Sequence, residues 1–202
     1  LLKRDLAMIP DYSLPKNDIP QSLGASELLN IFALLGISLS LTIAFYYQLA
    51  LHELPCPLCL LQRVGLIAVG IGFLMNVRFG IRSAHYGVSL IGALLTLAVA
   101  TRQMFLHIIP GRTNGYGSEV FGVHFYTLAV LSSLAAILFI GAMLMLKTWE
   151  RPLESKQKVN VAGKFAIVIF TLLIAANLVS TVLECGGGEC DSDPTFYQLL
   201  GK

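Results

Sequence analysis

Charged side chains are scarce in this sequence. Asp, Glu, Lys and Arg make up 13% of the 202 residues, roughly half the share found in a typical soluble domain. Hydrophobic residues make up 55%, more apolar surface than a soluble fold of this size can bury. This balance excludes an ordinary soluble enzyme, a disordered chain and a disulfide-dense secreted miniprotein. The net charge of +2 is too small to indicate nucleic acid as a partner. The composition therefore predicts a polytopic membrane protein.

Five apolar runs, each 18 to 24 residues long, account for most of the hydrophobic residues. About 20 helical residues cross the roughly 30 Å hydrocarbon core of a bilayer. The strands of a membrane barrel would alternate in polarity over about ten residues, and these runs do not. We predict an all-α fold, a four-helix transmembrane bundle plus a fifth transmembrane helix, within residues 31–183. The predicted spans are 31–51, 60–77, 87–106, 123–146 and 162–183.

The distribution of Lys and Arg predicts the orientation of these spans. Five crossings place the termini on opposite sides, and ten of the 14 basic residues fall on the side of the N-terminus. The ten are Lys3, Arg4, Lys16, Arg78, Arg82, Lys147, Arg151, Lys156, Lys158 and Lys164. Cytoplasmic loops carry the excess of basic residues, so this side is predicted to be cytoplasmic. Residues 1–30 contain three prolines and no continuous apolar core, which predicts a cytoplasmic arm rather than a signal peptide.

All four cysteines fall on the predicted outer side. Cys56 and Cys59 form a Cys-Pro-Leu-Cys motif between the first two spans, and Cys185 and Cys190 form Cys-Gly-Gly-Gly-Glu-Cys after the fifth. Two structural disulfides or a four-cysteine zinc site are the alternatives to a redox role. A bridge across two residues restrains the unfolded chain little, and short bridges of this kind are typically redox-active. The glycines usual between paired zinc ligands are missing from the first motif. The pattern favours redox chemistry and no metal.

The residues around the first pair favour a reactive thiolate. Pro57 suits the first turn of a helix, where its missing N–H costs nothing. Cys59 would then lie near the unpaired N–H groups and the positive end of the helix dipole. Arg63 follows one turn later on the same face, where its permanent charge would stabilise the thiolate. The alternative for Arg63 is an interfacial arginine that extends toward the headgroups.

The run Cys56-Pro-Leu-Cys59-Leu-Leu-Gln-Arg63 resembles the signature of the DsbB family of membrane quinone-dependent disulfide oxidases. Gln48 matches a glutamine position in the quinone pocket of that family. Arg102-Gln103 resembles the end of its third helix and Gly122–Tyr126 the start of its fourth, so the resemblance covers roughly residues 31–146. It implies a four-helix bundle, bound ubiquinone or menaquinone, and a DsbA-like thioredoxin-fold partner. It also implies the bacterial inner membrane, with the N-terminus cytoplasmic and the cysteine pairs periplasmic.

The second cysteine pair departs from the family pattern. Better-known members carry that pair between helices three and four, whereas residues 107–122 contain no cysteine here. Cys185 and Cys190 follow a fifth predicted helix instead, and the family role reaches them only by analogy.

The resemblance implies a membrane enzyme that reoxidises a periplasmic dithiol partner and passes the electrons to quinone. The partner would attack the Cys185–Cys190 disulfide in a redox tail at residues 184–202, where three consecutive glycines supply flexibility. The reduced pair would then exchange with Cys56–Cys59. We expect Cys56 to be the exposed exchange sulfur and Cys59 the sulfur that approaches the quinone. Arg63 completes the predicted catalytic set.

Further polar residues gather at the same outer level of the membrane. Gln48 and Gln103 are predicted, with Cys59 and Arg63, to contact the quinone; the alternative for the glutamines is hydrogen bonding between helices. His107 is a candidate proton relay, and the alternative is an interfacial residue. In the tail, Asp193 and Pro194 have the residue types of a helix start, which predicts a helix on the membrane surface as an alternative to a frayed terminus.

Two other functions remain open from the sequence. One is a vitamin-K-epoxide-reductase-like or transmembrane thiol reductant enzyme. The position of all four cysteines on one side, with the late pair separated by four residues, argues against it. The other is a non-enzymatic membrane scaffold with structural disulfides.

Overall fold

A computed structural model describes residues 24–107, 118–120, 122–145 and 159–201. Within them lie five helices, each long and apolar enough to cross a membrane. The helices are α1 (Ala25–Ala50), α2 (Pro57–Phe79), α3 (Ser83–His107), α4 (Phe125–Met145) and α5 (Val161–Cys185). The predicted all-α, polytopic membrane fold is confirmed.

Several helix boundaries differ from the predicted spans. α1 begins at Ala25, six residues before the predicted span, so the end of the predicted arm at 1–30 is helical; residues 1–23 lie outside the described part of the chain. α5 ends at Cys185, which makes this cysteine the last helical residue rather than part of a loop. Hydropathy alone predicted the spans, and helices extend past the apolar core wherever the backbone can continue its hydrogen bonding.

The start of the fourth span was also predicted too early. A hairpin of two short strands, β1 (Glu119–Val120) and β2 (Val123–His124), precedes α4. Gly122, at a φ of +76°, adopts a backbone conformation in the turn that favours glycine. The helix therefore begins at Phe125.

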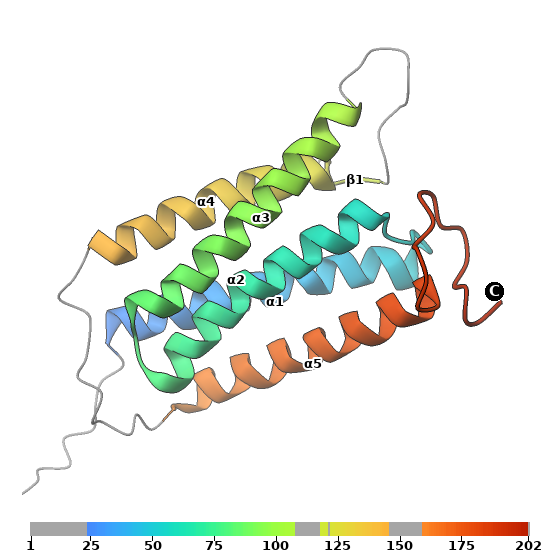
Figure 1. Ribbon diagram of the computed structural model, residues 1–202. Coiled ribbons are helices and arrows are strands. Elements are labelled where there is room, and N and C mark those ends of the chain that lie inside the picture. Colours follow the sequence, from blue (N-terminus) through green and yellow to red (C-terminus); the bar gives the residue numbers. More distant parts are fainter. Residues whose placement is uncertain (1–23, 108–117, 121, 146–158, 202) are drawn as a thin grey trace, which may run out of the picture.

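The helices pack with α2 at the centre. α2 contacts α1, α3 and α5, while α3 carries α4 on its far side. α5 thus lies across the bundle from α4 (Figure 1). Phe73 of α2 and Phe170 of α5 are buried in the shared core. The fifth helix is an integral part of the bundle.

Small residues allow α2 and α3 to approach closely. A Cβ at Gly92 of α3 would lie 2.6 Å from the backbone nitrogen of Val69 and 2.8 Å from the backbone oxygen of Gly65, both in α2. Inside a membrane, helices associate through such close packing because lipid provides no hydrophobic drive between them.

Polar side chains join the helices at the end opposite to the cysteines. Asn30 of α1 donates to the Tyr86 hydroxyl at 2.8 Å and accepts from Asn76 of α2 at 2.9 Å. His85 Nδ1 lies 3.0 Å from the Asn76 side-chain oxygen. These contacts satisfy the buried polar groups at that end. Both cysteine pairs lie at the other end, where the C-terminal segment packs (Figure 1).

Candidate functional site

The four cysteines form two disulfides, Cys56–Cys59 and Cys185–Cys190. Cys56 caps the N-terminus of α2, and its sulfur accepts a hydrogen bond from the backbone N–H of Cys59 at 3.1 Å. Pro57 takes the first turn of the helix, as predicted. The helix N-terminus therefore directs an amide at the sulfur of Cys56, whereas the sequence had suggested Cys59 as the sulfur that benefits. No group of three or more potential metal ligands occurs among the described residues.

The exposure of the first pair contradicts one expectation. Cys56, predicted to be the exposed exchange sulfur, is only 6% exposed. As the cap of α2, its side chain folds back over the first turn of the helix, toward the bundle. Cys59 is half-buried and lines a cavity. In this conformation the cavity reaches Cys59, and a protein partner has little access to Cys56.

Gln103 of α3 contacts both sulfurs of the first disulfide. Its side-chain nitrogen lies 3.4 Å from the sulfur of Cys56 and 3.5 Å from that of Cys59. Its side-chain oxygen accepts from Gln62 of α2 at 2.6 Å. Gln62 was not singled out from the sequence, although an amide within an apolar span is a recognisable signal. The two glutamines form a polar link between α2 and α3 directly beneath the disulfide.

Arg63 lies inside the bundle and is 8% exposed. It donates to the side-chain oxygen of Gln48 at 2.7 Å and to the backbone oxygen of Ala44 at 3.3 Å, both in α1. Its guanidinium carbon lies 5.4 Å from the centre of the Phe45 ring, a cation–π contact. A buried side chain with these partners does not extend to the headgroups. The described hydrogen bonds of Arg63 lead to α1 and α5, and none of them reaches the sulfur of Cys59.

Gln48 joins Arg63 to α5 and to the C-terminal segment. Its side-chain nitrogen donates to the hydroxyl of Ser180 at 2.6 Å and to that of Tyr197 at 3.1 Å. Gln48 is not among the described residues that line the cavity. The observed contacts match the interhelical hydrogen bonding that the sequence left open.

Two polar residues of α5 also escaped the sequence analysis. Asn177 accepts from Arg63 at 3.5 Å, and Glu184 is only 2% exposed. Asn177 interrupts the predicted apolar span, which was the available signal, whereas Glu184 follows directly after that span and was assigned to the tail. Their importance depends on the packing of α5 against α1 and α2, which the sequence does not show.

A cavity of about 870 Å³ opens beside the first disulfide. It lies between α1 and α4, over α2 and α3, and it collects four of the predicted site residues: Cys59, Arg63, Gln103 and His107. Aromatic rings of Tyr47, Phe125 and Tyr126 also face it. Tyr47 and Phe125 pack edge to face at 4.7 Å between ring centres. The cavity is therefore mostly apolar, with a small group of polar side chains near the disulfide.

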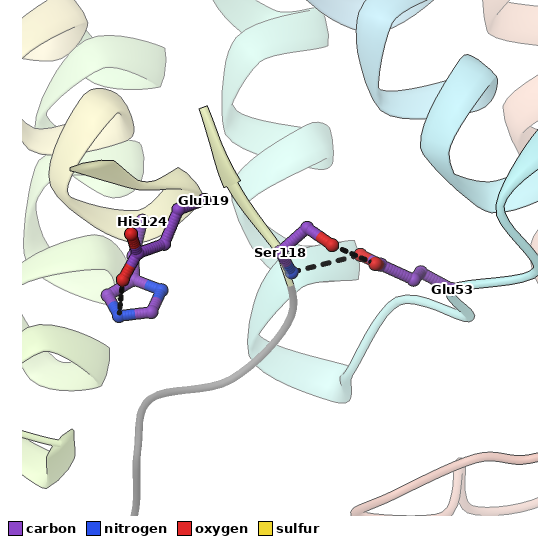
Figure 2. A network of polar contacts seen from close by, with 4 residues as sticks. All are labelled: Glu53, Ser118, Glu119 and His124. Carbon is purple, nitrogen blue, oxygen red and sulfur yellow. Dashed lines mark hydrogen bonds and ion pairs between the residues drawn. The ribbon is translucent and has the colours of Figure 1, made fainter. Parts of the chain in front are cut away.

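A stack of rings forms one wall at the outer end of the cavity. Tyr126 stacks on His107 at 5.4 Å and on His124 at 5.0 Å between ring centres. His124 Nε2 lies 3.3 Å from a carboxylate oxygen of Glu119, as Figure 2 shows. His107 thus belongs to an ordered wall.

The hairpin is held to the loop that precedes the first disulfide. Figure 2 shows the carboxylate of Glu53 receiving hydrogen bonds from the backbone N–H of Ser118, at 3.1 Å, and from its hydroxyl. This contact fixes the connection between α1 and α2 against the segment that leads into α4.

The C-terminal segment, residues 186–201, contributes to the lining of the cavity. Residues 192–195 line the cavity together with Cys59. The segment folds back on α5, since the backbone N–H groups of Gln198 and Leu199 donate to the carbonyls of Glu184 and Leu183 at 3.3 and 3.1 Å. The helix predicted to start at Asp193 and Pro194 is not formed; bends and a turn occupy 192–201. The hydrogen bonds to α5 and to Gln48 hold this segment without a helix of its own.

The fold and the site define a multi-pass helical membrane protein with two disulfides at one end of the bundle and an apolar cavity beside one of them. Residues 26–115 match the family described as Disulfide bond formation protein DsbB. Over these residues, which are less than half of the chain, it is similar to the DsbB family.

Curated relatives show the same similarity. A Disulfide bond formation protein B of Xanthomonas axonopodis pv. citri is 36% identical over 99 residues, which are 46% of this chain and 56% of that protein. The protein of the same name from Pseudomonas syringae pv. tomato is 40% identical over 76 residues, 36% of this chain and 44% of the relative. The chain thus spans about half the length of the curated relatives it matches. No solved structure matches it significantly.

Proposed function

We propose that this protein is a quinone-dependent protein disulfide oxidase of the bacterial inner membrane. It reoxidises the dithiol of a periplasmic DsbA-like partner, and ubiquinone or menaquinone is the terminal acceptor. One observation carries the proposal: Cys59 and Arg63 line a single cavity that the segment following the second disulfide also reaches. In this scheme the N-terminus is cytoplasmic and both disulfides are periplasmic, as the basic residues predict.

The residues around the cavity fit a quinone. A volume of about 870 Å³ lies within the range of small-molecule sites, which are mostly apolar with a few placed polar groups. Tyr47, Phe125 and Tyr126 offer aromatic surface for a ring, while Arg63 and His107 offer hydrogen-bond donors for carbonyl oxygens. A quinone bound there supplies an acceptor for two electrons and two protons. Gln48 would act by holding Arg63 and not by direct contact.

The reaction begins at the second disulfide. Cys190 is the more exposed of its two residues, whereas Cys185 is 5% exposed. A partner thiolate attacks the sulfur of Cys190, the bond to Cys185 breaks, and Cys185 leaves as a thiolate. The second partner thiol then displaces Cys190. The partner departs with a disulfide, and its two electrons and two protons remain on the Cys185/Cys190 dithiol.

The reduced pair then reacts with the first disulfide. One of its thiolates forms a mixed disulfide with the first pair, and the second thiolate resolves it, which restores Cys185–Cys190 and leaves Cys56 and Cys59 reduced. Because Cys56 is buried, this exchange requires movement of the C-terminal segment. Gly187, at a φ of 82°, lies among the three consecutive glycines, where the backbone changes conformation most easily. Cys59 is left facing the cavity, where Arg63 stabilises negative charge.

The experiment that tests this function measures both the oxidation of the partner and the reduction of the quinone. Purified protein in lipid nanodiscs is mixed with a reduced DsbA-like protein and a soluble quinone analogue, and partner disulfides and quinol are counted. The proposal predicts one quinol per partner disulfide, and loss of both in Cys59→Ser. A scaffold with structural disulfides would produce neither. Identification of a quinone that copurifies with the protein would decide between ubiquinone and menaquinone.

A further inference from the structure

Glu184 is an unusual residue within α5. It is 2% exposed, and neither oxygen of its carboxylate accepts a hydrogen bond from any described residue. Burying a carboxylate without donors is strongly unfavourable unless an opposite charge compensates it. Each such group in a folded protein calls for an explanation.

The opposite charge with which Glu184 interacts belongs to Arg63. Asn177, Ser180 and Glu184 follow one another at spacings of three and four residues, which places them on one face of α5. Asn177 accepts a hydrogen bond from Arg63 at 3.5 Å. Ser180 is linked to Arg63 indirectly, because it accepts from Gln48, which in turn accepts from Arg63. Glu184 interacts with Arg63 electrostatically without a direct ion-pair contact.

Arg63 lines the cavity, whereas Glu184 is not among the described lining residues. The carboxylate can therefore act on the charge of the arginine without touching a ligand. Helix α5 lies outside residues 26–115, the part of the chain that matches the DsbB family, so this charge comes from outside the matched residues.

We propose that Glu184 is the buried counter-charge of Arg63, a positioning residue through which α5 sets the net charge felt by a ligand in the cavity. With both charges present, the cavity is close to neutral and favours an uncharged quinone over an anionic one. Without Glu184, the same cavity carries an uncompensated positive charge. This inference rests on the proposed function, because it takes a quinone as the ligand.

Equilibrium binding of two quinone analogues of matched size tests the proposal. One is a neutral methoxynaphthoquinone, and the other is a hydroxynaphthoquinone that is anionic at the assay pH. The measured quantity is the preference for the anion, the dissociation constant of the neutral analogue divided by that of the anionic one. The full chain is used in nanodiscs, and no turnover is required.

Glu184→Gln should raise the preference for the anion by about tenfold, as expected when one charge is removed at a distance on the order of 10 Å with an effective dielectric constant of about 20. Glu184→Asp should retain the preference of the parent protein within about twofold, since it keeps the charge. Asn177→Asp adds a negative charge on the same face of α5 and should lower the preference. Glu189→Gln is the matched control: Glu189 also immediately precedes a cysteine of the second pair, but it is exposed, and its substitution should change nothing.

The outcomes separate this inference from the proposed function. If Arg63→Gln lowers the preference for the anion while Glu184→Gln and Asn177→Asp leave it unchanged, Glu184 is not the counter-charge and the inference is overturned, although the quinone site stands. If Glu184→Gln does not fold alone, the Arg63→Gln/Glu184→Gln double variant is compared with Arg63→Gln, and an equal preference for the anion in the two overturns the inference. If neither analogue binds the parent protein, the proposed function fails and the inference fails with it.

Discussion

Arg63 of α2 donates a hydrogen bond to Gln48 of α1, with 2.7 Å between Nη1 and Oε1. The residues are 15 positions apart in the sequence and flank the first disulfide motif on either side. Through Gln48, the arginine is connected to Ser180 of α5 and to Tyr197 of the C-terminal segment. One glutamine therefore links the proposed quinone site to the part of the chain that carries the second disulfide.

Gln48→Leu should loosen both ends of this connection. The substitution leaves the buried guanidinium without its closest acceptor, which costs on the order of 1–3 kcal/mol, and it removes a tether of the C-terminal segment. We expect a lower melting temperature, faster proteolysis after residue 186 and a higher apparent KM for quinone. Thr171→Val is a suitable control, because Thr171 is exposed and bonds only within its own helix. Identical proteolysis of the two variants would contradict the tethering role.

Arg63→Ala should impair quinone reduction far more than thiol exchange with the partner. The guanidinium lines the cavity, whereas the partner is proposed to react at the second disulfide. Steady-state turnover should fall by about two to three orders of magnitude, the loss seen when a charge-stabilising donor is removed, and the apparent KM for quinone should rise. Arg63→Lys should rescue only in part, because lysine lacks the planar fork that reaches Gln48 and Ala44 together. Turnover that is unaffected at all quinone concentrations would reduce Arg63 to a structural residue.

Gly92→Val should destabilise the bundle without touching the cavity. Its Cβ would meet backbone atoms of α2 at 2.6 and 2.8 Å, so α2 and α3 must separate. Overpacking of this kind typically costs about 1–3 kcal/mol, which a thermal unfolding series in detergent resolves. Gly87→Ala, in the same helix, is the control, since an added Cβ there meets nothing within 4 Å. Equal melting temperatures for both variants would contradict the close packing of α2 and α3.

Both disulfides should be accessible from the outer side of the membrane only. The unequal distribution of Lys and Arg motivates this expectation, and the structure places both pairs at one end of the bundle (Figure 1). After reduction of intact cells, a membrane-impermeant maleimide should label the cysteines without lysis. Labelling of either pair that requires lysis would overturn the orientation.

The sequence predicted those features that depend on composition and short-range spacing. The apolar runs predicted five helices, and the Cys-Pro-Leu-Cys motif predicted a disulfide at the start of α2, because a proline in the first turn and a cap are local properties. The exposure of Cys56 was predicted wrongly, since the direction of its sulfur depends on the fold of the cap and on Gln103, which comes from α3.

The buried polar residues of the site were the least predictable. Asn177 and Glu184 lie more than 110 positions from Arg63 in the sequence, and only the packing of α5 against α1 and α2 brings them close to it. The short hairpin before α4 was also missed, because two-residue strands leave no pattern of alternating polarity. The buried polar contacts depend on packing between residues that are far apart in the sequence, and a single sequence does not reveal that packing.

The central claim is that electrons from the partner enter at Cys185–Cys190 and reach the cavity through Cys56–Cys59. The most direct measurement uses Cys185→Ser, Cys190→Ser and the double variant with a reduced DsbA-like protein, analysed on non-reducing gels and by partner oxidation. Cys185→Ser should accumulate a mixed disulfide with the partner through Cys190. The double variant should keep its Cys56–Cys59 bridge and bind quinone, yet fail to oxidise the partner. Oxidation of the partner by the double variant at the rate of the parent protein would contradict the account, since the partner would then react with the first disulfide directly.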